Sequence, residues 1–308
     1  MTVMSSTLSH EKILLTGPTS QVGWPVAQAL ARDNEIYGLA RLSDPADREK
    51  LSAIGVHPVA VDLGRDDLDE VPDDCTIVLN FAVVKTGDFD YDIAANAEGA
   101  GRLVSRCRRA KAFLHCSSAG VYQPRKGPIA EDGALGDSHR TMLPTYSLAK
   151  IAAESVVRFA AREWNVPVTI ARFSVPYGGN GGWPWYHLVM MQAGTPIPVH
   201  PDDPCIYNPI HEDDYIAQIP GMLAIAKAPA TTVNWGGEPA ALADWCKYIG
   251  ELTGLEPKFR TTTSALAGIE LDLRRLHAAV GPARVGWKEG VRRMLETRAP
   301  DALRSQAR

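Results

Sequence analysis

A tyrosine and a lysine spaced four residues apart could together carry proton-transfer chemistry. Tyr146 and Lys150 stand at the start of a predicted helix, so this spacing places both side chains on one helical face. A phenol is a poor base at neutral pH because its pKa is about 10, but a neighbouring ammonium group stabilises the phenolate and lowers that pKa. Tyr146 could then take a proton from an alcohol or return one to a carbonyl.

A second pair of residues has the same spacing. Tyr122 and Lys126 match it, but a proline and a glycine interrupt that segment, so no regular helix is expected there. Without a helix, four-residue spacing does not make two side chains neighbours. The helical context therefore favours Tyr146 and Lys150 as the reactive pair. The alternative interpretation is that Tyr146 is a solvent-exposed tyrosine in the first turn of the helix and not a reactive group.

A serine at the end of a predicted strand is the third candidate. Residues 113–118 read FLHCSS, and parallel strands end at the ligand-binding edge of their sheet. We expect Ser118 to hydrogen-bond the reacting oxygen and hold it near Tyr146. Ser118, Tyr146 and Lys150 form the predicted catalytic set. The alternative is that both serines are ordinary strand-end residues.

A glycine-rich turn between the first predicted strand and helix is typical of a phosphate-binding loop. Residues 16–23 read TGPTSQVG, and such a turn directs backbone N–H groups and the positive end of a helix at a pyrophosphate. Ser20 replaces the usual middle glycine, and its hydroxyl could itself donate to phosphate. We expect Gly17, Ser20 and Gly23 to bind a dinucleotide. The alternative is a plain tight turn.

The residues that follow the next two strands bear on which dinucleotide is bound. The second strand ends in Arg41, and a guanidinium suits the 2′-phosphate of NADP, whereas an acidic residue would favour NAD. NADP is therefore the expected cofactor, and NAD is the alternative. A further interpretation is that Arg41 is simply an exposed residue at the end of a strand and contacts nothing. Asp62, after the third strand, could meet the adenine amino group or form a turn.

The elements that position these residues alternate along the first half of the chain. Strands are predicted at 12–16, 35–40, 56–61, 76–81, 113–117 and 166–173, and helices at 25–32, 91–110 and 145–164. This alternation predicts an α/β fold with a doubly wound parallel sheet of the Rossmann type.

The second half of the chain differs in composition and periodicity. Residues 174–209 are rich in glycine, proline and aromatic residues without a clear period, a late strand is expected at 232–235, and the rest is mostly helical. We predict a dinucleotide-binding domain at 11–175 that is completed by about 208–237. A substrate-binding insert at 176–207 and a small C-terminal lobe at 238–308 are expected to cover the carboxyl ends of the strands.

Composition narrows the class of protein. The 308 residues carry a net charge of −4, so no basic surface for nucleic acid is expected. Five scattered cysteines indicate neither disulfides nor a zinc site, which fits a reducing cytoplasm, and no metal is expected. No signal peptide or membrane span is predicted. A small-molecule substrate is the better expectation.

Seven motifs in order resemble those of the extended short-chain dehydrogenase/reductase family, which includes nucleotide-sugar epimerases, dehydratases and many ketone reductases. The resemblance covers about residues 12–237. It rests on TGPTSQVG at 16–23, NFA at 80–82, N-x-x-G at 96–99, SSAGVY at 117–122, YSLAK at 146–150, ARFSVPYG at 171–178 and IHEDD at 210–214.

The resemblance implies a role for each matching residue. It implies the same catalytic set, with Lys150 also holding the nicotinamide ribose, and a homodimer formed through helices 91–110 and 145–164. The implied cofactor contacts are Gly17, Ser20, Gln21, Val22, Gly23, Arg41, Asp62, Leu63, Phe81, Ala82, Lys150 and, through its backbone, Val175.

Departures from the family pattern bear on the substrate. Nucleotide-sugar enzymes of this family usually carry an arginine four residues before the IHxxD histidine, where this chain has Tyr207. No lysine or arginine lies between Arg172 and Lys227, so a diphosphate would lack a partner in that segment. Its aromatic residues suit an apolar ligand or a hydrophobic lid packed on the core. The expected substrate contacts are Trp183, Trp185, Tyr186 and Tyr207.

Three functions are compatible with these features. The main expectation is an NADP-dependent oxidoreductase that interconverts a ketone or aldehyde and an alcohol on a relatively apolar small molecule. The alternative is an NAD-dependent epimerase or dehydratase that acts on a nucleotide sugar or related sugar. A redox sensor that binds dinucleotide without chemistry is a third reading, and the complete catalytic set argues against it.

Overall fold

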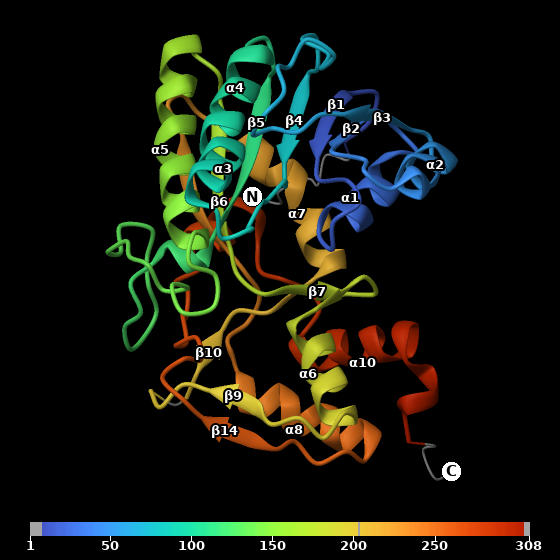
Figure 1. The fold of residues 1–308 in the computed structure, drawn as a ribbon, viewed down its shortest axis with the longest axis vertical. Coiled ribbons are helices and arrows are strands. Elements are labelled where there is room, and N and C mark those ends of the chain that lie inside the picture. Colours follow the sequence, from blue (N-terminus) through green and yellow to red (C-terminus); the bar gives the residue numbers. More distant parts are fainter. Residues whose placement is uncertain (1–7, 203, 305–308) are drawn as a thin grey trace.

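The computed structural model describes residues 8–202 and 204–304 and centres on a seven-stranded parallel sheet (Figure 1). The strand order is β12-β6-β5-β4-β1-β2-β3. This arrangement confirms the predicted Rossmann-like fold. The strands are β1 (Lys12–Thr16), β2 (Glu35–Ala40), β3 (Val56–Ala60), β4 (Ile77–Asn80), β5 (Ala112–Ser118), β6 (Val168–Phe173) and β12 (Thr231–Trp235).

Helices cover both faces of the sheet, which explains why its strands are almost continuously apolar. Side chains alternate across β1, so Ile13 and Leu15 pack in one core and Leu14 in the other. The first core also contains residues of α1 (Gly23–Leu30), α2 (Pro45–Ala53), α7 (Glu212–Ala224) and α9 (Arg274–Val280). The second contains residues of α4 (Gly99–Arg106) and α5 (Tyr146–Trp164), which lie side by side in Figure 1.

The order of the strands fixes the position of the binding crevice. β1 pairs with β2 on one side and with β4 on the other, so the direction of winding reverses next to β1. Ligands of open α/β sheets bind at the carboxyl ends of strands at such a switch point. The glycine-rich turn follows β1, and therefore lies at this point.

The helix predicted at 91–110 has a different form. It starts earlier, as α3 (Phe89–Ile93), passes through a π-helical turn (Ala94–Glu98) and ends with α4 at Arg106. The Asn96 side-chain amide donates to the carbonyls of Asp92 (2.7 Å) and Val84 (2.7 Å). Asn96 thus fastens the π turn to the segment that follows β4.

A smaller lobe lies beyond the carboxyl ends of the strands (Figure 1). Trp245, Leu188 and Met294 are fully buried in its core. One helix of the insert was not predicted from the sequence. Its own residues are apolar on every side of the helix, so they show no amphipathic period. The lobe and the segments linking it to the sheet contain α6 (Trp183–Gln192), α8 (Leu242–Thr253), α10 (Trp287–Arg298), β7 (Pro176–Gly178), β8 (Gly181–Gly182), β9 (Ile197–Val199), β10 (Ile206–Tyr207), β11 (Ile210–His211), β13 (Ala240–Ala241) and β14 (Phe259–Thr261), and 3-10 turns lie at Ala119–Val121 and Pro300–Ala302.

In the part of the chain that the structure describes, no helix has the length and apolar character that a membrane span requires.

Candidate active site

The glycine-rich turn forms a tight backbone cradle at the start of α1. Gly17 has a φ of +67°, which favours glycine, and a Cβ atom at Gly23 would lie 2.0 Å from the Gly17 carbonyl oxygen. Ser20 closes the turn, because its N–H donates to that carbonyl and its Oγ accepts from the Gly23 N–H, both at 3.0 Å. The Ser20 hydroxyl proton remains available to a phosphate oxygen.

The donors at this helix end fit an anionic ligand. Among the described residues, the N–H groups of Gln21 and Val22 have no hydrogen-bond partner. Unpaired N–H groups at a helix N-terminus, together with the helix dipole, attract phosphate. The cradle therefore fits the pyrophosphate of a dinucleotide.

The end of β4 lies against the same turn. The Thr16 hydroxyl donates to Asn80 Oδ1 (2.7 Å) and accepts from the Ala82 N–H (2.9 Å). A Cβ atom on Gly17 would lie 3.2 Å from the backbone of Ala82. Gly17 and Ala82, two of the predicted cofactor residues, are therefore neighbours at the carboxyl edge of the sheet.

Four further predicted cofactor residues turn their side chains into the protein. Phe81, Leu63 and Val175 are buried, and Val22 packs against the core that contains α1. The Val175 carbonyl accepts from the Ile210 N–H (2.9 Å). Any ligand contact made by these four residues would come mainly from their backbone.

A charged cluster follows β2 and β3. The Tyr91 hydroxyl donates to Asp62 (2.7 Å), the Arg65 guanidinium lies 4.7 Å above the Tyr91 ring, and Arg41 also hydrogen-bonds Tyr91. Burial and the Asp62 carboxylate raise the pKa of Tyr91, and Arg41 acts in the opposite direction. Tyr91 and Arg65 join the predicted Arg41 and Asp62 here. The sequence did not indicate them, because no local pattern links Tyr91 to the strand ends.

The three predicted catalytic residues meet at the end of β5. Lys150 is buried and donates from Nζ to the Cys116 carbonyl (2.7 Å), and Tyr146, which is half-buried, hydrogen-bonds Ser118. Ser118 Oγ also accepts from the Gly120 N–H (3.0 Å). The helical face of α5 and the strand end thus bring Ser118, Tyr146 and Lys150 together.

The environment of this set affects both ionisable groups. Burial raises the pKa of Tyr146 to about 12, and its hydrogen bond with Ser118 acts against that rise. Burial also lowers the pKa of Lys150, while the neighbouring Glu154 carboxylate acts against that change. Burial thus makes the charged forms of both groups less favourable, so a Tyr146 phenolate needs stabilisation by a neighbouring positive charge.

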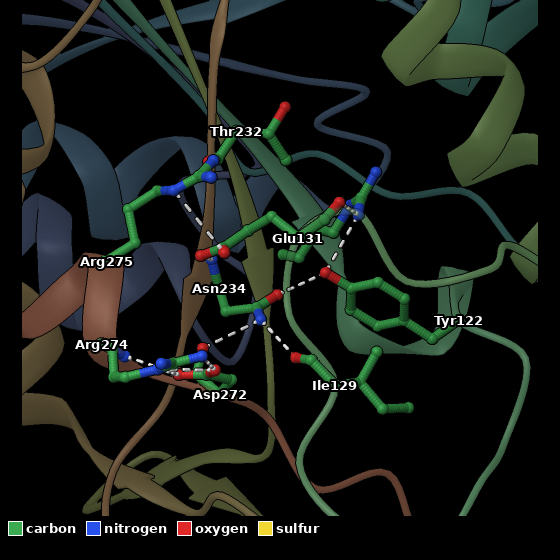
Figure 2. Close-up of polar contacts among 9 residues, drawn as sticks. Tyr122, Ile129, Glu131, Thr232, Asn234, Asp272, Arg274 and Arg275 are labelled. Atoms are coloured by element: carbon green, nitrogen blue, oxygen red, sulfur yellow. Dashed lines mark hydrogen bonds and ion pairs between the residues drawn. The ribbon is translucent and has the colours of Figure 1, made fainter.

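Tyr122 lies in a separate buried network, drawn in Figure 2. Its hydroxyl donates to Asn234 Oδ1 (2.6 Å) and accepts from Arg172 (2.9 Å), and the Asn234 amide donates to the carbonyls of Ile129 and Asp272. Residues 123–128 contain no helix, as expected. Tyr122 therefore links the segment after β5 to β6 and β12, and neither of these hydrogen bonds involves a lysine.

The β7–β8 hairpin connects the smaller lobe to the glycine-rich turn after β1, which is the candidate phosphate loop. Asn180 donates from its amide to the carbonyls of Ser20 (3.3 Å) and Gln21 (3.0 Å), and the Gln21 amide donates to the Pro176 carbonyl (3.1 Å). The side chain of Gln21, a predicted cofactor residue, is thus engaged with the hairpin.

Three of the four predicted substrate residues, Trp183, Trp185 and Tyr207, belong to or pack against the core of the smaller lobe. Tyr207 is buried, its hydroxyl donates to the Leu266 carbonyl (3.0 Å), and Trp183 packs edge-on against its ring at 5.2 Å. Trp185 instead lies under the Arg298 guanidinium at 4.4 Å. Tyr186 is 59% exposed. Trp183 and Trp185 therefore both pack against the core of the lobe that contains Tyr207, whereas the Tyr186 side chain is exposed to solvent.

Comparisons with known proteins agree with this geometry. The model of the NAD dependent epimerase/dehydratase family matches residues 13–186. No curated protein matches the chain by sequence.

Solved structures of similar fold cover almost the whole chain. UDP-glucuronic acid 4-epimerase from Bacillus cereus, in complex with UDP-glucuronic acid and NAD, is 19% identical with a TM-score of 0.79, covering 93% of this chain and 98% of that one. MoeE5 in complex with UDP-glucose and NAD is 21% identical, with a TM-score of 0.77 and the same two coverages. UDP-glucose 4-epimerase from Thermotoga maritima is 19% identical, with a TM-score of 0.74 over 93% and 98%. At these identities the likeness establishes the fold alone.

Proposed function

Because the chain belongs to the NAD dependent epimerase/dehydratase family of extended short-chain dehydrogenases/reductases, we propose that it transiently oxidises a hydroxyl group of a sugar or related molecule. The observation that carries this proposal is the meeting of Ser118, Tyr146 and Lys150 beside the phosphate loop. This reading is the alternative of the sequence analysis, and family membership favours it over net reduction of an apolar ketone.

The chain's own residues would accept and return the hydroxyl proton of the substrate. Tyr146 takes the hydroxyl proton of the substrate, and the Lys150 ammonium beside it stabilises the phenolate that precedes this step. Ser118 holds the reacting oxygen. The Cys116 carbonyl fixes Lys150 at 2.7 Å, so the ammonium is in place before the substrate arrives. A nicotinamide dinucleotide held by the cradle after β1 would supply the hydride acceptor and donor.

We propose NADP as the preferred cofactor and NAD as the alternative. Arg41 and Arg65 both contact Tyr91 at the strand ends where the adenosine ribose of a dinucleotide would lie. Two guanidinium groups suit a 2′-phosphate, and the Asp62 carboxylate of this cluster already accepts from Tyr91. Two of the structures named above were solved with NAD, so the proposal of NADP rests on the two arginines alone.

Net reduction of an apolar ketone or aldehyde is the second candidate. It is favoured by Tyr207, which stands where nucleotide-sugar enzymes of this family usually carry an arginine and whose hydroxyl is engaged with the Leu266 carbonyl. A tyrosine at this position offers no positive charge to a substrate diphosphate.

A substrate panel separates the two candidates. The enzyme would be incubated with NADPH or NADP, or with NADH or NAD, and with UDP-glucose, UDP-glucuronic acid, free aldoses, cyclohexanone and benzaldehyde. We expect proton NMR to detect conversion of a sugar without net change of absorbance at 340 nm. Net loss of absorbance with a simple carbonyl, and no conversion of any sugar, would instead establish the second candidate.

We also propose a homodimer formed through the outer face of α5 and the adjacent α4. Leu148 and Phe159 lie eleven residues apart, three helical turns, and therefore share one face of α5. They are 41% and 66% exposed. Exposed apolar side chains in a row on a long helix are typical of a helix-to-helix interface.

A further inference from the structure

An imidazole ring lies directly beside the candidate catalytic tyrosine. His139 belongs to the long connection between β5 and α5, and its ring centroid is 5.1 Å from that of Tyr146, with a 48° angle between the planes. His139 could not be predicted as a site residue, because nothing in the sequence pattern of residues 123–145 indicates where that connection folds. Two groups this close can reach neighbouring atoms of one small substrate.

Hydrogen bonds hold His139 in place. The Ser138 and Ser147 hydroxyls both donate to the Gly120 carbonyl at 2.7 Å, and the His139 N–H donates to Ser147 Oγ (3.3 Å). The connection is thereby fixed to the segment that directly follows Ser118. His139 is a pre-positioned group of the site.

The same contacts favour one tautomer of the His139 ring. Ser138 Oγ lies 2.9 Å from His139 Nδ1 and 2.7 Å from the Gly120 carbonyl oxygen, which accepts the hydroxyl proton. With its proton on that carbonyl, Ser138 accepts from Nδ1–H, and the lone pair of the ring lies on Nε2. Nε2 has no hydrogen-bond partner among residues 8–202 and 204–304.

The surroundings of the ring keep it neutral. Burial lowers the pKa of His139 to about 4, and the charge of Lys85, from the segment after β4, acts in the same direction. A neutral imidazole with a free Nε2 lone pair can accept a hydrogen bond or take up a proton from a neighbouring group.

The glycine next to Ser118 makes room for this ring. A Cβ atom on Gly120 would lie 2.5 Å from Cε1 and 3.2 Å from Nε2 of His139, closer than nonbonded atoms approach. Gly120 has an ordinary backbone conformation, so this space is the reason that a side chain is excluded there. His139 thus occupies the place that a side chain at position 120 would otherwise take.

We propose that His139 is a second acid–base group of the active site and acts on the carbon next to the one that is oxidised. This inference rests on the proposed function, because it needs the ketone that the oxidation step creates. Nε2 takes a proton from that carbon: the C–H bond breaks, an N–H bond forms, and the electron pair moves into an enolate whose oxygen Tyr146 and Ser118 hold. The proton then returns from Nε2 to the carbon, so the cycle needs no further reagent.

Deuterium exchange tests this step. The wild-type enzyme would be incubated in D2O with its dinucleotide and with UDP-glucose, UDP-glucuronic acid and the free aldoses, and proton NMR would follow the loss of the signal next to the oxidised carbon. We expect exchange in the wild type and a loss of about 100-fold or more in His139→Asn. The hydride step, followed by single-turnover absorbance at 340 nm, should lose far less of its rate than deuterium exchange does in this variant.

Matched variants separate catalysis from anchoring. The Asn amide can still donate to Ser138 but has no base at Nε2, so a purely structural role would survive His139→Asn. Ser138→Ala keeps the base and removes its anchor, and should lower exchange about 10-fold or less. Added imidazole should restore part of the exchange in His139→Ala.

Two results would overturn the inference while leaving the proposed function intact. One is hydride transfer without deuterium exchange in the wild type, and the other is undiminished exchange in His139→Asn. Failure of the proposed function looks different, because the wild type would then show neither single-turnover hydride transfer from a sugar at 340 nm nor conversion of any sugar.

Discussion

Tyr122 and Tyr146 stand at the same spacing from a lysine, yet their surroundings give them different roles. The Tyr122 hydroxyl is fully engaged with Asn234 and Arg172, and burial raises its pKa to about 12. The Tyr146 hydroxyl lies beside Ser118, with Lys150 one helical turn away. At the scale of single residues, chemistry is set by which neighbours the backbone brings within reach.

Arg41 is the residue whose substitution tests cofactor choice most simply. Arg41→Ala removes a charged donor at the proposed 2′-phosphate site, and a charge-assisted hydrogen bond contributes about 1.5–3 kcal/mol. We expect NADPH binding to weaken at least about 10-fold and NADH binding to change less than about twofold, as measured by fluorescence titration. Arg48→Ala is the control, because Arg48 is an exposed arginine on the neighbouring α2. Equal weakening of both dinucleotides by Arg41→Ala would refute the NADP assignment.

At the scale of elements, one face of α5 links the reacting group to the core. Tyr146, Lys150 and Glu154 follow one another at four-residue spacing, and Glu154 is completely buried. Its carboxylate accepts from Ser117 (2.6 Å) and from two nitrogens of Arg172 (2.9 and 2.8 Å) on β6. This ion pair fixes the rotation of α5 on the sheet, and with it the positions of Tyr146 and Lys150.

Glu154→Gln should therefore destabilise the fold. The substitution leaves the Arg172 guanidinium buried without its counter-charge, and breaking a buried pair in this way costs about 3–5 kcal/mol. The free energy of unfolding from urea denaturation at pH 7 measures this loss. Arg274→Gln removes an exposed ion pair, with the Arg274 side chain 89% exposed, and should cost no more than about 1 kcal/mol. Equal, small losses in both variants would contradict the role given to Glu154.

The same pair predicts how stability depends on pH. Burial raises the pKa of Glu154, but the hydrogen bonds and charge of Arg172 outweigh burial, so its pKa lies below the ordinary 4.5. A carboxyl group with a lowered folded-state pKa stabilises the fold above its unfolded pKa, and this stabilisation is lost as pH falls through the folded value. Urea denaturation of the wild type should show decreasing stability below about pH 4.5, with a shallower decrease in Glu154→Gln.

Elements with a clear period or clear end signals could be predicted from the sequence, and the others could not. β1 and β2 have the predicted bounds, and α5 starts within one residue of its prediction. The helix α6 was missed because Trp183–Gln192 is apolar on every side and shows no amphipathic period. Likewise, His139 and Tyr91 reach the site through long connections and side-chain contacts, which leave no local signal.

At the scale of the whole molecule, two lobes meet at the carboxyl edge of the sheet (Figure 1). The β7–β8 hairpin joins them through Asn180 and Gln21, and α10 adds a contact from Arg298 to the Gly179 carbonyl (3.1 Å). The phosphate loop is thus attached to the lobe that would cover a substrate. Cofactor binding and the position of this lobe should be coupled for that reason.

The proposed homodimer is tested at the same scale. Phe159→Glu places a charge on the exposed apolar face of α5, and burying an unpaired charge in an interface is strongly unfavourable. Light scattering with size-exclusion chromatography should find a dimer for the wild type and a monomer for this variant. Phe259→Glu, on an exposed residue of β14 in the other lobe, should leave the dimer intact. A monomeric wild type would rule out the interface.

The most direct test of the account compares the two tyrosines. Wild type, Tyr146→Phe and Tyr122→Phe would be mixed with dinucleotide and the sugar panel, and single-turnover hydride transfer would be followed at 340 nm. We expect Tyr146→Phe to lose at least about 100-fold in rate while binding the dinucleotide as tightly as the wild type. Tyr122→Phe should keep the wild-type rate and lose about 1–3 kcal/mol of stability. A wild-type rate in Tyr146→Phe would contradict the assignment of the reactive group.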